Sequence, residues 1–247
     1  MADADGTAVP PRKNADLGTR AISAAVMLAI VGAALIADGV WLNALVLAVA
    51  LATLVELVLL VVKATDTIAF RLAAILAGIV YVGVAGLAMA GMHPALFVVV
   101  LGSVVMVDSF AYLFGRTLGG PKIAPSISPS KTWAGLLGGI VGASLWLGLV
   151  AFGHRTLVSL FPGNATLSDS YFKLPDGWNA FALILAGGAI VAVLAQAGDF
   201  LESWLKRKAG VKDSSNLIPG HGGVFDRTDG LVPVVLLFAA VTGGVAS

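Results

Sequence analysis

The chain contains no cysteine and only three histidines. The absence of cysteine excludes disulfides, thiolate metal sites and cysteine nucleophiles. Charge is also scarce, because Asp, Glu, Lys and Arg make up only 12% of the residues, about half of their share in soluble domains. Any site chemistry must therefore come from a few polar side chains, and the places where these gather are informative.

Apolar residues, in contrast, make up 58% of the 247 residues, and the mean hydropathy is +0.96. Such a composition is typical of an integral membrane protein, whose solvent is the bilayer. A spanning helix needs about 20 apolar residues. The sequence predicts seven such helices, or more if a helical hairpin is merged, at residues 21–37, 41–62, 72–90, 94–114, 133–152, 178–197 and 230–245. We therefore expect an all-α, polytopic membrane protein.

The basic residues predict how this protein is oriented. Short cytoplasmic loops retain Lys and Arg, and with a cytoplasmic N-terminus all 15 basic residues except Arg155 and Lys173 lie on the inner side. Residues 1–19 are polar, so we expect a disordered tail, followed by a single transmembrane catalytic domain over residues 20–247. Two long polar loops, near 115–132 and 198–229, would then face the cytoplasm, and the predicted location is the inner (plasma) membrane.

Charge gathers in the stretch SWLKRKAGVKDSSNLIPGHGGVFDRTD, residues 203–229. It holds the basic residues Lys206, Arg207, Lys208, Lys212 and Arg227, the acidic residues Asp213, Asp226 and Asp229, and the turn His221-Gly222-Gly223. Glycine leaves backbone N–H groups open to a phosphate, and carboxylates could hold one or two Mg²⁺ ions. The pattern indicates a phosphate and metal site at the membrane surface. Two simpler interpretations remain open: anchoring of the basic run to anionic lipid headgroups, and a loop histidine that only forms hydrogen bonds.

The residues that precede this stretch add to the pattern. If the helix predicted at 178–197 continues, then Asp199, Glu202, Ser203 and Lys206 lie on one face where it leaves the membrane. A salt-bridged helix end is the alternative.

The other polar loop carries hydroxyls and one ammonium group just before a helix, at Ser128, Ser130, Lys131 and Thr132. A helix N-terminus favours an anion, although simple helix capping explains such hydroxyls equally. Asp108 and Glu56 lie within apolar runs, where an ionisable side chain usually faces the interior of the bundle. Glu56 could bond to a neighbouring helix or take part in the site. A cation-coupled transporter would also use such residues, but its site would lie near the midplane rather than in a charged loop.

Taken together, these residues resemble the phosphatidate cytidylyltransferases, or CDP-diacylglycerol synthases. The chain matches every fixed position of that family's C-terminal signature, at Ser203, Lys206, Arg207, Lys212, Asp213, Pro219, His221, Gly222, Gly223, Asp226, Arg227 and Asp229. Segments 108–116, 128–133 and 198–203 are similar to further family segments, whereas the first hundred residues resemble the family only in their general character. Ala134 departs from the family pattern, which commonly has Glu there.

The resemblance implies transfer of the cytidylyl group of CTP to phosphatidic acid, giving CDP-diacylglycerol and pyrophosphate for phospholipid biosynthesis. It implies catalytic roles for Asp199, Lys206, Asp226, Arg227 and Lys131. Substrate-binding roles fall on Ser128, Ser130, Thr132, Ser203, Arg207, Lys212, His221, Gly222 and Gly223. The implied metal ligands are Asp199, Asp226, Asp229 and Asp108, holding Mg²⁺ and a second cation if there is one. The implied partners are the two substrates, membrane lipid and a second copy of the chain, with no nucleic acid. An enzyme acting on a different lipid phosphate and an inactive scaffold are the remaining alternatives.

Overall fold

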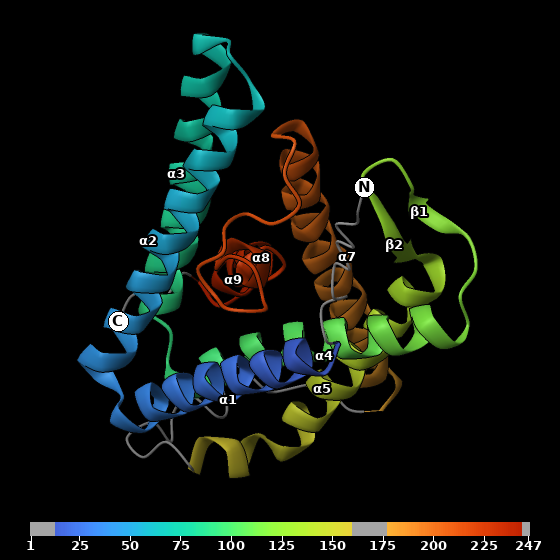
Figure 1. Ribbon diagram of the computed structural model, residues 1–247. Coiled ribbons are helices and arrows are strands. Elements are labelled where there is room, and N and C mark those ends of the chain that lie inside the picture. Colours follow the sequence, from blue (N-terminus) through green and yellow to red (C-terminus); the bar gives the residue numbers. More distant parts are fainter. Residues whose placement is uncertain (1–12, 160–176, 244–247) are drawn as a thin grey trace, which may run out of the picture.

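A computed structural model describes residues 13–159 and 177–243 of the chain, and these are mostly helical (Figure 1). The long helices are α1 (Lys13–Ala37), α2 (Gly39–Ala64), α3 (Ile68–Ala90), α4 (Pro94–Thr117), α5 (Trp133–Ser159) and α7 (Trp178–Lys208). Two short helices follow, α8 (Phe225–Thr228) and α9 (Leu231–Val241). Each of the six long helices contains an apolar stretch long enough to cross a membrane. The prediction of a helical, multi-pass membrane protein is therefore confirmed.

The predicted count of seven spans is not confirmed. The last expected span, at 230–245, corresponds to α9, which has 11 residues and is about 16 Å long. The hydrocarbon core of a bilayer is about 30 Å thick, so α9 alone does not span it. Backbone geometry explains where α9 ends, because Gly243 has a φ of 80° and follows the last helical turn. Residues 244 and 245 of the expected span lie outside the described residues.

The N-terminal helix begins inside the expected polar tail. Helix α1 starts at Lys13, and no proline interrupts it up to its end at Ala37. Residues 1–12, which form the rest of that tail, lie outside the described residues. Lys173 and the side chain of Arg155, on which the predicted orientation partly rests, lie outside them as well.

The helices form two groups that meet around α9. Helix α5 packs between α4 and α7, α2 packs against α3, and α9 contacts α3, α4 and α7. Figure 1 looks nearly along α9, with α2 and α3 on one side and α7 on the other. Small residues let two helices approach closely: a Cβ added at Gly142 of α5 would lie 2.4 Å from the carbonyl oxygen of Met106 on α4. This packing brings the loop between α4 and α5 beside the C-terminal half of α7.

One element departs from the expected all-helical fold. The loop between α4 and α5 contains an antiparallel hairpin of β1 (Lys122–Ala124) and β2 (Ser128–Thr132), paired at Lys122 with Thr132 and at Ala124 with Ser128. The hairpin leads directly into α5, whose first residue is Trp133. Strand β2 therefore holds Lys131 and its neighbours in a fixed backbone position, where the sequence suggested only a loop.

Candidate active site

Helix α7 carries the acidic and basic residues of the expected site out of the membrane. It runs without interruption from Trp178 to Lys208, so the condition under which Asp199, Glu202 and Lys206 share one helix face is met. Lys206 Nζ lies 2.5 Å from Glu202 Oε2, one turn earlier, and 2.6 Å from Asp226 Oδ1. This ammonium group therefore joins the end of α7 to the segment around α8.

The Asp226 carboxylate is held by the protein on both oxygens. Its Oδ1 accepts from Lys206, and its Oδ2 accepts from the amides of Ser214 at 2.9 Å and Gly223 at 2.7 Å and lies 2.8 Å from the Ser214 hydroxyl oxygen. Burial opposes ionisation, but the side chains of Glu202 and Lys206 and the two amides outweigh it and hold the pKa of Asp226 well below its usual range. The Gly223 amide thus serves Asp226, whereas the sequence suggested that it cradles a phosphate.

The two polar loops meet at a second ion pair. Lys131 of β2 donates to the Asp199 carboxylate of α7, and both side chains are largely buried, at 25% and 16% exposed. Near it, Arg207 Nε lies 3.4 Å from the carbonyl oxygen of Ile127 in the hairpin. Burial lowers the pKa of Lys131, while the charges of Asp108, Asp229 and Glu202 act in the opposite direction.

A small cavity opens beside this ion pair. Asp108 of α4, Lys131 of β2, and Gln196 and Asp199 of α7 supply its polar lining, and Gly135 and Gly139 of α5 form part of its wall. The structure thus brings Asp108 together with Lys131 and Asp199. Gln196 was not among the predicted site residues. The signal that could have found it is an amide inside an apolar run, one helical turn before Asp199.

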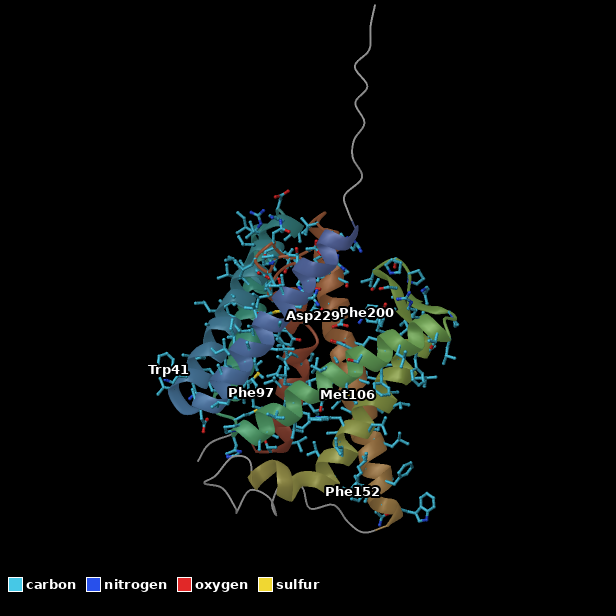
Figure 2. The ribbon with its side chains drawn as sticks, turned by 60° about the horizontal axis from the view of Figure 1, so that its bottom comes forward. Trp41, Phe97, Met106, Phe152, Phe200 and Asp229 are labelled. Carbon is cyan, nitrogen blue, oxygen red and sulfur yellow. The ribbon has the colours of Figure 1, made fainter. Side chains whose placement is uncertain are left out.

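Asp229 lies between the two ion pairs. Burial raises its pKa, against which the Gly230 amide, Glu202, Lys131 and Lys206 act. The backbones also touch here, since a Cβ added at Gly198 would lie 2.0 Å from the Asp229 carbonyl oxygen. Figure 2 shows Asp229 inside the helical assembly, whereas Trp41 and Phe152 point outward from it.

Glu202 completes this group of carboxylates. Its side chain is 2% exposed, one oxygen pairs with Lys206, and its Oε1 is buried without a hydrogen-bond partner in the described part of the chain. Glu202 was expected on the same helix face as Asp199 but had no predicted role. Its spacing of three residues from Asp199 was the available signal.

The remaining predicted residues have varied surroundings. Arg227 donates from Nε and Nη2 to the carbonyl oxygen of His221, and the Nδ1 of His221 is buried without a partner in the described residues. The hydroxyl of Thr132 accepts from the Gly135 amide at 3.0 Å, as the capping alternative predicted. Ser128 is buried, Ser203 is half-buried, and Ser130, Lys212 and Lys208 are exposed. Gly222 has a φ of 83°, which favours glycine.

Glu56 bonds to a neighbouring helix, as one of the two alternatives predicted, because the amide of Phe225, the first residue of α8, donates to Glu56 Oε2 at 2.8 Å. In the loop before α8, the hydroxyl of Ser214 lies 2.7 Å from the same oxygen. The same hydroxyl is the one that contacts Asp226. Glu56 is therefore connected to the site, although it comes from α2.

Residues 71–243 match the sequence model of the Cytidylyltransferase family. This range contains both polar loops and leaves Glu56 outside. The chain is also 41% identical over 174 residues to a protein named phosphatidate cytidylyltransferase from Brucella abortus biovar 1 (strain 9-941), covering 67% of this chain and 56% of that protein.

Two more proteins of the same name are similar to the chain. One from Rickettsia bellii (strain RML369-C) is 42% identical over 137 residues, covering 56% of this chain and 53% of that protein. One from Rickettsia felis (strain ATCC VR-1525 / URRWXCal2) is 43% identical over 137 residues, covering 55% and 54%. The matches thus span just over half the length of these relatives. Because the family model matches well over half of the chain, the chain belongs to the cytidylyltransferase family.

Proposed function

We propose that this chain transfers the cytidylyl group of CTP to phosphatidic acid, giving CDP-diacylglycerol and pyrophosphate. The observation that carries the proposal is the meeting of two buried lysine–carboxylate pairs from the two polar loops, Lys131 with Asp199 and Lys206 with Asp226. Family membership supports it, and so does the similarity to proteins named phosphatidate cytidylyltransferase.

The reaction is an in-line displacement at phosphorus. A phosphate oxygen of phosphatidic acid forms a bond to the α-phosphorus of CTP, and the bond from that phosphorus to the bridging oxygen of the β-phosphate breaks. Pyrophosphate leaves with the electron pair. Nucleophile and leaving group are both ionised, so no proton has to move, and catalysis consists mainly of positioning and charge neutralisation.

The lysines supply the charge neutralisation. Lys131 and Lys206 are each fixed by carboxylates, so their ammonium groups are already oriented before substrate arrives. Arg227, Arg207 and Lys212 lie around the same end of α7 and would bind the outer phosphates. The hydroxyls of Ser128, Ser130, Thr132 and Ser203, together with His221 and Gly222 of the turn, complete the substrate-binding set in this proposal.

The donor set also fits a magnesium ion. No group of three or more His, Asp or Glu side chains in the described ranges is arranged to hold a metal by itself. Mg²⁺ in nucleotide sites, however, usually takes one or two carboxylates and completes its shell with phosphate oxygens and water. When bound, it would neutralise charge on the transferred phosphates.

Asp226 is the least available of the proposed metal ligands. Asp199 and Asp229 are the favoured ligands, with Asp108 beside them, since both oxygens of Asp226 already accept hydrogen bonds from the protein. The buried, unpartnered Oε1 of Glu202 lies in the same group of carboxylates and is a further candidate.

The site would face the cytoplasm from the inner membrane. Both polar loops lie at one end of the helices, which agrees with the side predicted from the basic residues. A site at the end of the spanning helices lets the lipid substrate enter sideways from the adjacent leaflet. A homodimer remains the proposed assembly.

Pyrophosphate release by detergent-purified protein tests the proposal. The assay supplies CTP, phosphatidic acid and Mg²⁺, with ATP, GTP and UTP as controls and one arm without lipid. We expect release only with CTP and lipid together. Absence of release from folded protein, with several other lipid phosphates tried, would contradict the proposed function, whereas release with another lipid phosphate alone would correct the substrate.

A further inference from the structure

Glu56 lies on a spanning helix, and it is almost completely enclosed by protein. Glu56 is only 4% exposed, and both oxygens of its carboxylate accept hydrogen bonds. Oε1 accepts from the Ser215 hydroxyl at 2.7 Å and the Val224 amide at 3.1 Å. Oε2 accepts from the Ser214 hydroxyl at 2.7 Å and the Phe225 amide at 2.8 Å. Four donors thus stabilise a buried carboxylate that no Lys, Arg or His of the described residues pairs with.

The four donors come from two places in the chain. Ser214 and Ser215 precede the glycine-rich turn, and Val224 and Phe225 follow it. Glu56 therefore ties together the two ends of that turn, which is also closed by a bridge between Ile218 and Gly222. A single side chain from α2 thus fixes the position of the turn relative to the helices.

The turn sits directly on the Glu56 carboxylate. A Cβ added at Gly223 would lie 2.3 Å from Glu56 Oε2 and 2.0 Å from the Ser214 hydroxyl oxygen, so only glycine fits here. Next to it, Phe225 is 1% exposed and packs in a cluster that includes Leu57, the residue after Glu56. The hydrogen bonds of Glu56 and the apolar contacts of Leu57 thus both fix the segment around Phe225.

The link to the reaction site runs through Ser214. Its hydroxyl lies between two carboxylates, 2.7 Å from Glu56 Oε2 and 2.8 Å from Asp226 Oδ2, and its amide donates to Asp226 as well. Asp226 in turn orients Lys206. A displacement of the Ser214 segment would therefore move both partners of that ion pair.

We propose that Glu56 is a positioning residue for the active site: by holding residues 214–225 it fixes Asp226 and Lys206 in the geometry that cytidylyl transfer needs. The inference rests on the proposed function. It extends the site to a residue of α2 that lies outside the segment matched by the family model.

Substitution of Glu56 by Gln is the sharpest test, because it preserves volume. An amide has only one acceptor oxygen, whereas Val224 N–H and Phe225 N–H point at different oxygens of Glu56. Whichever way the amide is turned, one backbone N–H meets an NH₂ group. Glu56→Gln must therefore lose one of the two backbone hydrogen bonds that hold the end of the turn at Val224 and Phe225.

Thr53→Val is a matched control. Thr53 lies one turn before Glu56 on α2, is 1% exposed, and shares a hydrogen bond of 2.9 Å with Thr228 of α8. It joins the same two helices but has no contact with Ser214 or Asp226. Thr228 also keeps its bond to the Val224 carbonyl oxygen, so the control removes a buried link between α2 and α8 and nothing else.

Two measurements on the full-length protein in detergent separate positioning from simple stability. Amide hydrogen exchange of peptides covering 214–225 should accelerate about tenfold in Glu56→Gln relative to Thr53→Val, as expected for the loss of one hydrogen bond. At a temperature where all variants are folded, kcat should fall about 10–100-fold in Glu56→Gln, with a far smaller change in KM for CTP and no change in Thr53→Val.

The two readouts fail in different ways. Equal amide exchange rates in the two variants would show that Glu56 does not hold the turn in place, whether or not the protein is active. Faster exchange with an unchanged kcat would overturn its part in the reaction. An inactive wild type would instead refute the proposed function, and with it the catalytic part of this inference, while the exchange result would still decide what Glu56 holds.

Discussion

Replacing Lys206 by Met should destabilise the protein strongly, because the ammonium group is the shared partner of two buried carboxylates. The side chain of Lys206 is 13% exposed, and those of Glu202 and Asp226 are 2% and 7% exposed. Breaking a buried pair by removing one partner costs about 3–5 kcal/mol, since a charge is left without compensation. For a chain of this size that corresponds to a fall of roughly 6–20 °C in the unfolding midpoint.

Thermal unfolding in detergent measures this loss, with Lys208→Met as the control. Lys208 carries the same side chain at the same end of α7 but is exposed, so its substitution should change the midpoint little. Acidification should partly restore Lys206→Met, because protonation of a surplus carboxylate removes the charge that lacks a partner. Adding Glu202→Gln to Lys206→Met should also recover part of the loss, so the two substitutions should not be additive.

The reasoning would be refuted by a Lys206→Met protein as stable as Lys208→Met. It would also fail if the double variant were simply the sum of its parts, since the carboxylates would then not depend on the ammonium group. Turnover should be lost in Lys206→Met in either case, if this group neutralises substrate phosphate as proposed.

Three further predictions concern the same site. Asp226→Asn should abolish turnover in a pyrophosphate assay while the protein stays folded. Because the folded pKa of Asp226 lies below 3.8, the ionised carboxylate stabilises the fold above that pH and progressively less below it. The stability difference from wild type should therefore stay constant from about pH 5 to pH 8 and shrink below about pH 4. Gly198→Ala should lower both stability and activity, because the new methyl group meets the Asp229 carbonyl oxygen, whereas Gly83→Ala, with no atom within 4 Å, should be harmless; equal effects in unfolding scans would contradict this packing argument. Removal of Mg²⁺ by a chelator should stop turnover and its return should restore it, with Asp199→Asn raising the Mg²⁺ concentration required; activity that survives chelation would rule out the proposed metal.

Much of the fold could be predicted from the sequence, because the bilayer imposes a length and a composition on each span. All six long helices coincide with predicted apolar runs, although α1 begins earlier than expected, at Lys13, and α7 continues past its predicted end to Lys208. The same rule failed for the last apolar run, since hydropathy does not register that α9 is only 11 residues long. The hairpin at 122–132 was missed because its strands have three and five residues and little apolar alternation.

Residue types also indicated which side chains belong to the site, but not how they pair. Asp108, Lys131, Asp199, Lys206 and Asp226 were all named from sequence, and the structure brings them to one end of the helices. Their pairings join residues that are 68 and 20 positions apart, and spacing along one helix says nothing about such contacts.

The contribution of Glu56 shows the limit most clearly. The sequence placed a carboxylate in an apolar run, where it has to find partners, and so determined that it would be buried and bonded. Only the tertiary structure decided that those partners are Ser214, Ser215, Val224 and Phe225, more than 150 residues along the chain. Solvent preference is a property of each residue, so sequence reveals it, whereas hydrogen-bond partners depend on how α2 and the loop before α8 are brought together by packing.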